Sequence, residues 1–172
     1  MNIRTIECKA RVDSLEPYEE KLQTLHPRAL GLDHQVDTYF NAPRGRLKLR
    51  EGNIEYALIH YDREDVASTK QSHVILFQYE PDDALKEILR IQLGIKAVVD
   101  KQRRIYFVDN VKFHFDTVAG LGHFIEVEAI DEREEFTREQ LEQQCEQYIR
   151  FFGLDRSSLV DKSYADLVSG KQ

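Results

Sequence analysis

The segment from Ile3 to Val12 reads IRTIECKARV and alternates between two kinds of side chain. Apolar and charged residues occupy alternate positions, with Ile6, Cys8 and Ala10 in one set and Glu7, Lys9 and Arg11 in the other. A period of two is typical of a β-strand whose faces meet different surroundings. The segment therefore predicts a strand with one apolar face and one wholly charged face.

Further segments have strand character, and turn residues such as Gly, Pro and Asn separate most of them. They cover residues 33–41, 45–51, 53–63, 73–80, 95–108, 111–118 and 124–130. Helical patterns cover residues 13–26, 82–94, 137–153 and 159–168, with Asp13 and Thr137 as expected caps of the first and third. The polar segment 65–71 has no periodic apolar residues, so we expect a flexible loop there.

The order of these segments favours one closed sheet. Strand, helix and then several strands occur twice, which indicates two similar halves. We predict an α+β protein with a single domain over residues 1–172: a closed eight-stranded antiparallel β-barrel with flanking helices. Its charged faces would point inward and helices would cover the apolar exterior, which inverts the usual arrangement.

Composition excludes several classes of function. The net charge of −7 opposes sequence-independent binding to nucleic acid, because that binding needs an excess of Lys and Arg. No apolar run approaches the roughly 20 residues that span a bilayer, and charges interrupt the N-terminus where a secretory signal would be apolar. Cys8 and Cys145 are expected to be reduced and packed. We expect a cytoplasmic protein that binds neither nucleic acid nor a membrane; a homodimer stays open.

Basic residues gather on one face of several predicted strands. Arg46, Lys48 and Arg50 share a face of the segment 45–51. For a single strand of this kind, an outer face exposed to solvent is a sufficient explanation. Lys9 and Arg11 show the same arrangement on a second predicted strand, which weakens that explanation. Further cations stand near strand ends: Arg63, Lys70, Lys101 and Arg103. Guanidinium groups match phosphate oxygens with paired hydrogen bonds, so the sequence indicates a local site for a polyanion.

Acidic residues form a second pattern. Glu126 and Glu128 share one face of the segment 124–130, which by itself is also usual in a soluble strand. In a polar barrel they become candidate ligands of Mg²⁺ or Mn²⁺, with Glu7 and Asp116 as additional oxygen donors. His114 is a secondary candidate for the same cavity, although a lone histidine beside an aspartate is more often structural. Asp37 could orient a neighbouring cation.

Taken together, these stretches resemble the CYTH, or triphosphate tunnel, family. The resemblance rests on six blocks in the family's order: Ile6 to Arg11, Asp37 to Phe40, Arg46 to Arg50, Lys101 to Arg103, His114 to Glu128 and Asp161 to Tyr164. The Gly120-Leu121-Gly122 and Lys162-Ser163-Tyr164 stretches are similar to class IV adenylyl cyclase-like members. One departure is Thr5, which stands where the family's usual ExExK motif has its first glutamate.

The resemblance implies an eight-stranded tunnel that binds a triphosphate beside Mg²⁺ or Mn²⁺. By position, the phosphate ligands would be Lys9, Arg11, Lys48, Arg50, Lys101 and Arg103, and the metal ligands Glu7, Glu126 and Glu128. Glu7, Lys9, Glu126 and Glu128 would form the catalytic set. The residue patterns described above add Arg46, Arg63 and Lys70 as further phosphate ligands and Asp116 as a further metal ligand. Thr5 leaves the number of metal ions open.

The attacking oxygen would decide the product. Attack by the ribose 3′-hydroxyl of ATP gives cyclic AMP and pyrophosphate, and attack by water hydrolyses ATP, tripolyphosphate or thiamine triphosphate. We favour the cyclase-like activity, with the triphosphatase as an alternative. A third alternative, suggested by Thr5, is a sensor that binds triphosphate or polyphosphate without turnover.

Overall fold

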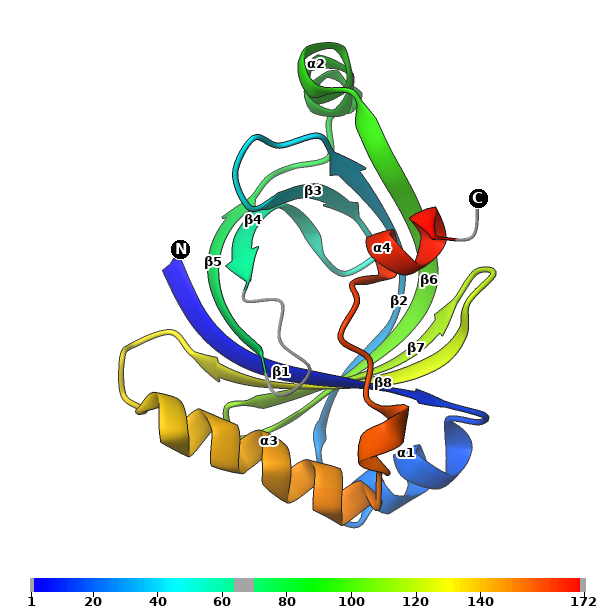
Figure 1. The fold of residues 1–172 in the computed structure, drawn as a ribbon, viewed down its shortest axis with the longest axis vertical. Coiled ribbons are helices and arrows are strands. Elements are labelled where there is room, and N and C mark those ends of the chain that lie inside the picture. Colours follow the sequence, from blue (N-terminus) through cyan, green and yellow to red (C-terminus); the bar gives the residue numbers. More distant parts are fainter. Residues whose placement is uncertain (1, 64–69, 171–172) are drawn as a thin grey trace.

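Eight strands close into a barrel in the ring order β1-β5-β4-β3-β2-β6-β7-β8 (Figure 1). The structure is a computed structural model that describes residues 2–63 and 70–170. The strands are β1 (Asn2–Val12), β2 (Arg28–Phe40), β3 (Arg46–Glu51), β4 (Tyr56–Arg63), β5 (Lys70–Gln78), β6 (Ile95–Val108), β7 (Val111–Val118) and β8 (Gly122–Asp131). Every neighbouring pair is antiparallel, which confirms the predicted barrel.

The register of β1 against β8 decides which charges meet. Glu7 is paired with Glu128 and Lys9 with Glu126, so the charged faces of the two strands are the same face. Their other face is apolar. The inverted arrangement predicted from the alternation is therefore present on this side of the barrel.

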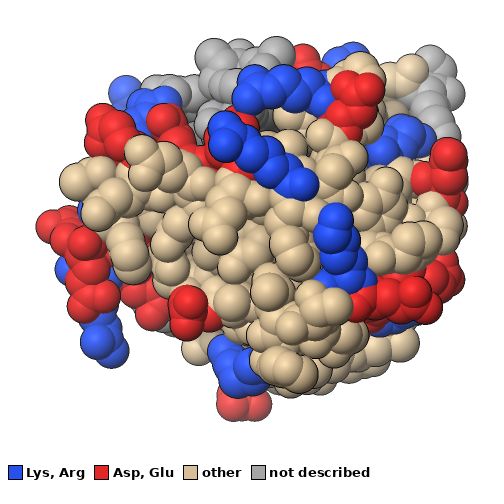
Figure 2. Space-filling model, turned by 90° about the horizontal axis from the view of Figure 1, so that it is seen from below, with Lys and Arg blue, Asp and Glu red and all other residues tan. Residues whose placement is uncertain are grey.

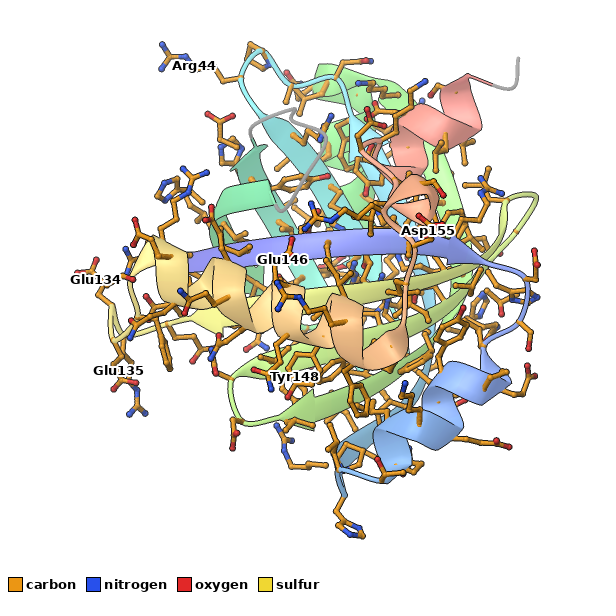
Figure 3. The ribbon with its side chains drawn as sticks, turned by 60° about the horizontal axis from the view of Figure 1, so that its bottom comes forward. Arg44, Glu134, Glu135, Glu146, Tyr148 and Asp155 are labelled. Carbon is orange, nitrogen blue, oxygen red and sulfur yellow. The ribbon has the colours of Figure 1, made fainter. Side chains whose placement is uncertain are left out.

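Helices cover the apolar outer face of β1, β7 and β8. The helices are α1 (Glu16–Gln23), α2 (Asp83–Leu93), α3 (Arg138–Phe152) and α4 (Tyr164–Ser169), with a 3₁₀ turn at Arg156–Ser158. Figure 1 shows α1 and α3 together below these strands and α2 apart at the opposite side. Figure 3 shows α3 running alongside β1, with Glu146 on this helix.

An aromatic cluster joins α3 to the barrel. Phe113 of β7 is fully buried and meets Tyr148 edge-on, with ring centroids 4.7 Å apart. Phe152 packs edge-on against Phe113 and Phe115. Each such pair contributes roughly 0.5–1.5 kcal/mol beyond the burial of its surface. Cys8 and Cys145 are buried free thiols in the same core, as predicted.

Local signals fix the ends of α3. Thr137 and Gln140 form a reciprocal capping box, and Gly153 ends the helix in the left-handed conformation that glycine adopts without strain. Both predicted boundaries are confirmed. Asp82 likewise caps α2 by accepting from the Ala84 amide.

Several boundaries differ from the prediction, and three of these differences have a clear physical reason. The N-cap of α1 is Leu15 and not Asp13, and Pro17 stands in its first turn. β2 begins at Arg28 because it pairs with β6 from Phe107 onward, through an irregularity at Gly31 that hides the alternation. The C-terminal helix begins only at Tyr164, since Leu159 bridges to Ala10 and the Val160 amide donates to the Lys9 carbonyl.

The predicted loop 65–71 falls largely on residues 64–69, which lie outside the described residues, whereas residues 70 and 71 belong to β5. None of the helices in residues 2–63 and 70–170 is long and apolar enough to cross a membrane. On the face shown in Figure 2, positive and negative side chains are intermixed around the rim, and no broad basic patch forms there.

Candidate functional site

A cavity of about 310 Å³ lies inside the barrel, and all eight strands contribute to its lining. Its walls differ. We define the charged wall as Glu7, Lys9, Asp37, Lys48, Arg50, Lys101, Arg103, Lys112, Glu126 and Glu128, and the uncharged wall as Ile3, Thr5, Ala57, Ile59, Ser72, Val74 and Leu76. The uncharged wall comes from β4, β5 and the start of β1.

Asp37 organises one part of the charged wall. It pairs with Lys101 at 2.7 Å, with Lys48 at 3.1 Å and with Arg50 through two hydrogen bonds of 2.8 and 2.9 Å. Burial opposes ionisation of this carboxyl, but the three cations hold its pKa well below the usual range. Asp37 therefore remains charged and orients three candidate phosphate ligands, the role its position in the sequence suggested.

Lys101 is the most deeply buried cation of this group. Its side chain is 1% exposed. Burial, together with the nearby guanidinium groups of Arg50 and Arg103, lowers the pKa of Lys101 to about 7 in spite of Asp37. An additional anion beside it would favour the charged form again.

Glu126 organises the second part. Its carboxylate accepts from Lys9 at 2.9 Å, from Arg103 at 2.7 Å and from His114 at 3.1 Å. Arg103 also binds Asp116 through two hydrogen bonds, of 2.7 and 2.5 Å. Burial opposes ionisation of Glu126, yet Lys9 and Arg103 hold its pKa well below the usual range.

His114 is neutral in this setting. Burial and the positive charge of Arg103 lower its pKa to about 3. Nδ1 contacts Glu126, whereas buried Nε2 has no hydrogen-bond partner among the described residues. A neutral imidazole that uses Nδ1 as its donor leaves Nε2 as an acceptor, in a residue that helps to line the cavity.

Glu7 and Glu128 face each other across the β1–β8 pair. Burial is the main cause that raises the pKa of Glu128 to about 7, and the charges of Glu7 and Glu126 add to it. Carboxylates paired in this way are unfavourable unless a proton or a cation lies between them. The donor set therefore fits a hard divalent ion.

A cage made of protein ligands is absent: no group of three or more His, Cys, Asp or Glu side chains within residues 2–63 and 70–170 is arranged around a metal position. Mg²⁺ commonly uses one or two carboxylates and completes its coordination with water and substrate phosphates. The Glu7–Glu128 pair fits that mode. Asp116 does not line the cavity, since Arg103 and the Tyr164 hydroxyl, at 2.7 Å, occupy its oxygens.

Two residues from outside the strands also line the cavity. Tyr164 of α4 enters beside Lys9, whose ammonium lies 4.0 Å from the ring centroid. Glu55, just before β4, binds Lys112 of β7 at 2.5 Å. β4 and β7 stand opposite each other in the ring, so this ion pair spans the barrel.

Asp33 holds Glu55 in this place. One Asp33 oxygen accepts from the Asn53 and Ile54 amides, and the other from the Glu55 amide. A side chain at Gly52 would approach Asp33 to 2.7 Å, so glycine is required at this turn. The turn is thereby folded inward over the cavity.

Apart from Asp116, the structure places the predicted site residues in three groups. Those that line the cavity are Glu7, Lys9, Lys48, Arg50, Lys101, Arg103, Glu126 and Glu128. Arg11 and Arg46 share the inward register but lie beyond the lining, where Arg11 donates to the Leu121 carbonyl and Arg46 pairs with Asp166. The side chains of Arg63 and Lys70 lie outside the described residues.

Sequence reasoning missed three residues of the site. Lys112 was detectable, because it stands two positions before His114 on the same strand face. Glu55 gave no such signal, since a turn delivers it. Tyr164 ends the sixth sequence block, but no periodicity indicated that a terminal helix brings its side chain to the cavity.

A closed antiparallel barrel with paired cations and carboxylates in its interior defines a charged-tunnel protein. The CYTH domain family model matches residues 4–164, and the chain belongs to this family. The resemblance inferred from the six sequence blocks is thus confirmed.

Individual relatives are distant but match over nearly their whole length. A Methanocaldococcus jannaschii protein named "Putative adenylate cyclase" is 23% identical, over 94% of this chain and 97% of its own. The PH1012 protein from Pyrococcus horikoshii is 26% identical with a TM-score of 0.81, covering 95% and 98% of the two chains. A Hippeastrum protein, described as a "Putative adenylyl cyclase" with a dominant triphosphatase activity, is 15% identical with a TM-score of 0.64, covering 100% and 97%.

Proposed function

We propose that this protein is a divalent-metal-dependent enzyme that binds a triphosphate in the barrel and acts on it as a class IV adenylyl cyclase-like enzyme, converting ATP to cyclic AMP and pyrophosphate. The observation that carries the proposal is the charged wall, in which six cations converge on one cavity: Lys9, Lys48, Arg50, Lys101, Arg103 and Lys112. Their fixed positions suit a chain of phosphates in line.

The carboxylates of the charged wall support this proposal. Asp37 and Glu126 hold the cations in place before any ligand arrives, so that little side-chain ordering remains to be done on binding. Strand β6 connects the Asp37 cluster to the Glu126 cluster, because Lys101 pairs with Asp37 and Arg103 pairs with Glu126. A ligand with several phosphates can reach both.

Glu7 and Glu128 would hold Mg²⁺ or Mn²⁺, with Glu126 beside them. Such an ion, when bound, neutralises charge on the phosphates. The chain's own residues have separate roles. Lys9 and Arg103, which Glu126 holds in place, orient the phosphates. Neutral His114 accepts a hydrogen bond through Nε2. Lys101, with its lowered pKa, takes up a proton as the polyanion binds.

Hydrolysis remains the second candidate activity, because the same charged wall stabilises attack by water. The Hippeastrum protein of the same fold, with its dominant triphosphatase activity, makes this alternative concrete. The third candidate, a triphosphate or polyphosphate sensor, follows from Thr5 at the position of the first motif glutamate.

Phosphorus NMR separates these outcomes. ATP, tripolyphosphate and thiamine triphosphate are each incubated with the protein and Mg²⁺ or Mn²⁺. We expect cyclic AMP and pyrophosphate from ATP; orthophosphate release from any of the three identifies a triphosphatase. Binding of these ligands without turnover would contradict the enzyme and support the sensor.

Glu126→Gln and Glu128→Gln test the assigned carboxylates. Each should abolish turnover and leave the fold intact, as judged by circular dichroism. Glu146→Gln, on the outer side of α3 where Glu146 pairs with Arg156, is the matched control (Figure 3). Activity retained in both cavity variants would show that the metal assignment is wrong.

A further inference from the structure

We propose that Thr5 and Ser72 form a subsite for the organic part of a triphosphate ester. The inference rests on the proposed function and deepens it, because it selects esters such as nucleoside triphosphates over inorganic tripolyphosphate. Neither hydroxyl belongs to the charged wall.

The two hydroxyl groups are neighbours by register. Thr5 of β1 is paired with Ser72 of β5, and both residues line the cavity. Thr5 is 2% exposed and Ser72 is 3% exposed. Neither Oγ1 of Thr5 nor Oγ of Ser72 has a hydrogen-bond partner in the described part of the chain.

Buried hydroxyl groups without partners are costly, and native structures rarely retain them without reason. Two of them side by side on a cavity wall are placed where a ligand group could supply the missing hydrogen bonds. A ligand without a hydrogen-bonding group at this position would leave both hydroxyls buried and unsatisfied. The hydroxyl pair therefore also disfavours such a ligand.

The surroundings decide the charge of that ligand group. Ile3 pairs with Val74 on one side of the hydroxyls, and Ile130 is paired with Thr5 on the other. Ile59 pairs with Leu76 further along the uncharged wall. A phosphate or a metal ion would lose its hydration against these side chains, whereas a sugar or heterocycle offers both apolar surface and neutral donors or acceptors.

The cavity therefore has two chemically distinct halves. The charged wall suits the phosphates, and the uncharged wall with its hydroxyl pair suits the alcohol part of the ester. Tripolyphosphate has nothing to place against the uncharged wall. We expect the wild-type protein to prefer at least one ester by tenfold or more.

Titration calorimetry of ATP, thiamine triphosphate and tripolyphosphate with Mg²⁺ tests the inference. Thr5→Val and Ser72→Ala each remove one hydroxyl and should weaken the preferred ester about two- to tenfold, the usual effect of one neutral hydrogen bond. Their affinity for tripolyphosphate should not change. Thr5→Ser should retain the wild-type preference.

Thr38→Val is the matched control, since the Thr38 hydroxyl on β2 is equally buried and unpartnered among the described residues but does not line the cavity. Equal affinity of the wild type for tripolyphosphate and both esters would overturn the inference and leave the proposed function standing. The inference is also overturned if Thr5→Val and Ser72→Ala weaken the binding of all three ligands alike. If the wild type binds none of the three, the proposed function fails and the inference fails with it.

Discussion

Replacing Asp37 with Asn should destabilise the free protein and increase its response to a polyanion. Asp37 is 1% exposed and contacts three cations, at 2.7 to 3.1 Å. The substitution keeps the size of the side chain and removes only its charge. It leaves Lys48, Arg50 and Lys101 close together without their common partner.

The magnitude follows from the burial of this cluster. Breaking a buried ion pair by removing one partner costs about 3–5 kcal/mol. The proton that Lys101 can release limits the loss, so we expect the lower part of that range. For a domain of this length, 1 kcal/mol corresponds to roughly 2–4 °C in Tm, which gives a decrease of about 6–12 °C.

Thermal unfolding with and without tripolyphosphate measures both effects. A phosphate chain can replace the lost carboxylate, so the ligand-induced rise in Tm should be larger in Asp37→Asn than in the wild type. Asp100→Asn is the control, because its pair with His34 on the same two strands is exposed and worth at most about 1 kcal/mol. Equal losses in Asp37→Asn and Asp100→Asn, or a smaller ligand response in Asp37→Asn, would refute the reasoning.

Three other predictions concern the core, a cap and the pH dependence. Phe113→Ala removes the aromatic contact with α3 and should cost about 3–5 kcal/mol in chemical denaturation, whereas Phe77→Ala, at a side chain 61% exposed, should cost less than about 1 kcal/mol. Thr137→Ala should cost about 1 kcal/mol through loss of the capping box and leave ligand affinity unchanged. Because Lys101 is charged below its pKa of about 7 and neutral above it, calorimetric affinity for tripolyphosphate should fall as the pH rises through 7; Lys101→Met should remove that step.

The sequence allowed the barrel to be predicted because alternation survives in the strands that carry the charges. Lys9 and Glu126 each stand in a strict period of two, and a strand that is apolar on one face fixes its own register. Thr137 and Gly153 gave the bounds of α3 through local chemistry alone. These features depend on neighbours in the chain, so they can be recognised without the fold.

Other features depend on residues that meet only in three dimensions. Arg11 and Arg46 have the inward parity of their strands, but parity does not tell how far along the barrel the cavity extends. Glu55 reaches the cavity because Asp33, 22 positions earlier, binds the backbone of its turn. A periodic pattern in the sequence does not indicate such a contact between a side chain and the backbone of a distant turn.

The ion pairs inside the barrel reconcile an acidic protein with a site for an anion. A wall of unpaired cations would repel itself in the folded state and cost several kcal/mol for each buried charge. The carboxylates of Asp37 and Glu126 remove that cost. They also determine how many phosphates a ligand needs, because the ligand must replace their contacts with the cations. A single phosphate can replace the contacts of one carboxylate, whereas Lys101 and Arg103, two positions apart on β6, are separated by about 6–7 Å along the strand. Only a ligand with several phosphates in line can compete at both clusters at once, so the internal acids favour polyphosphates over monophosphates.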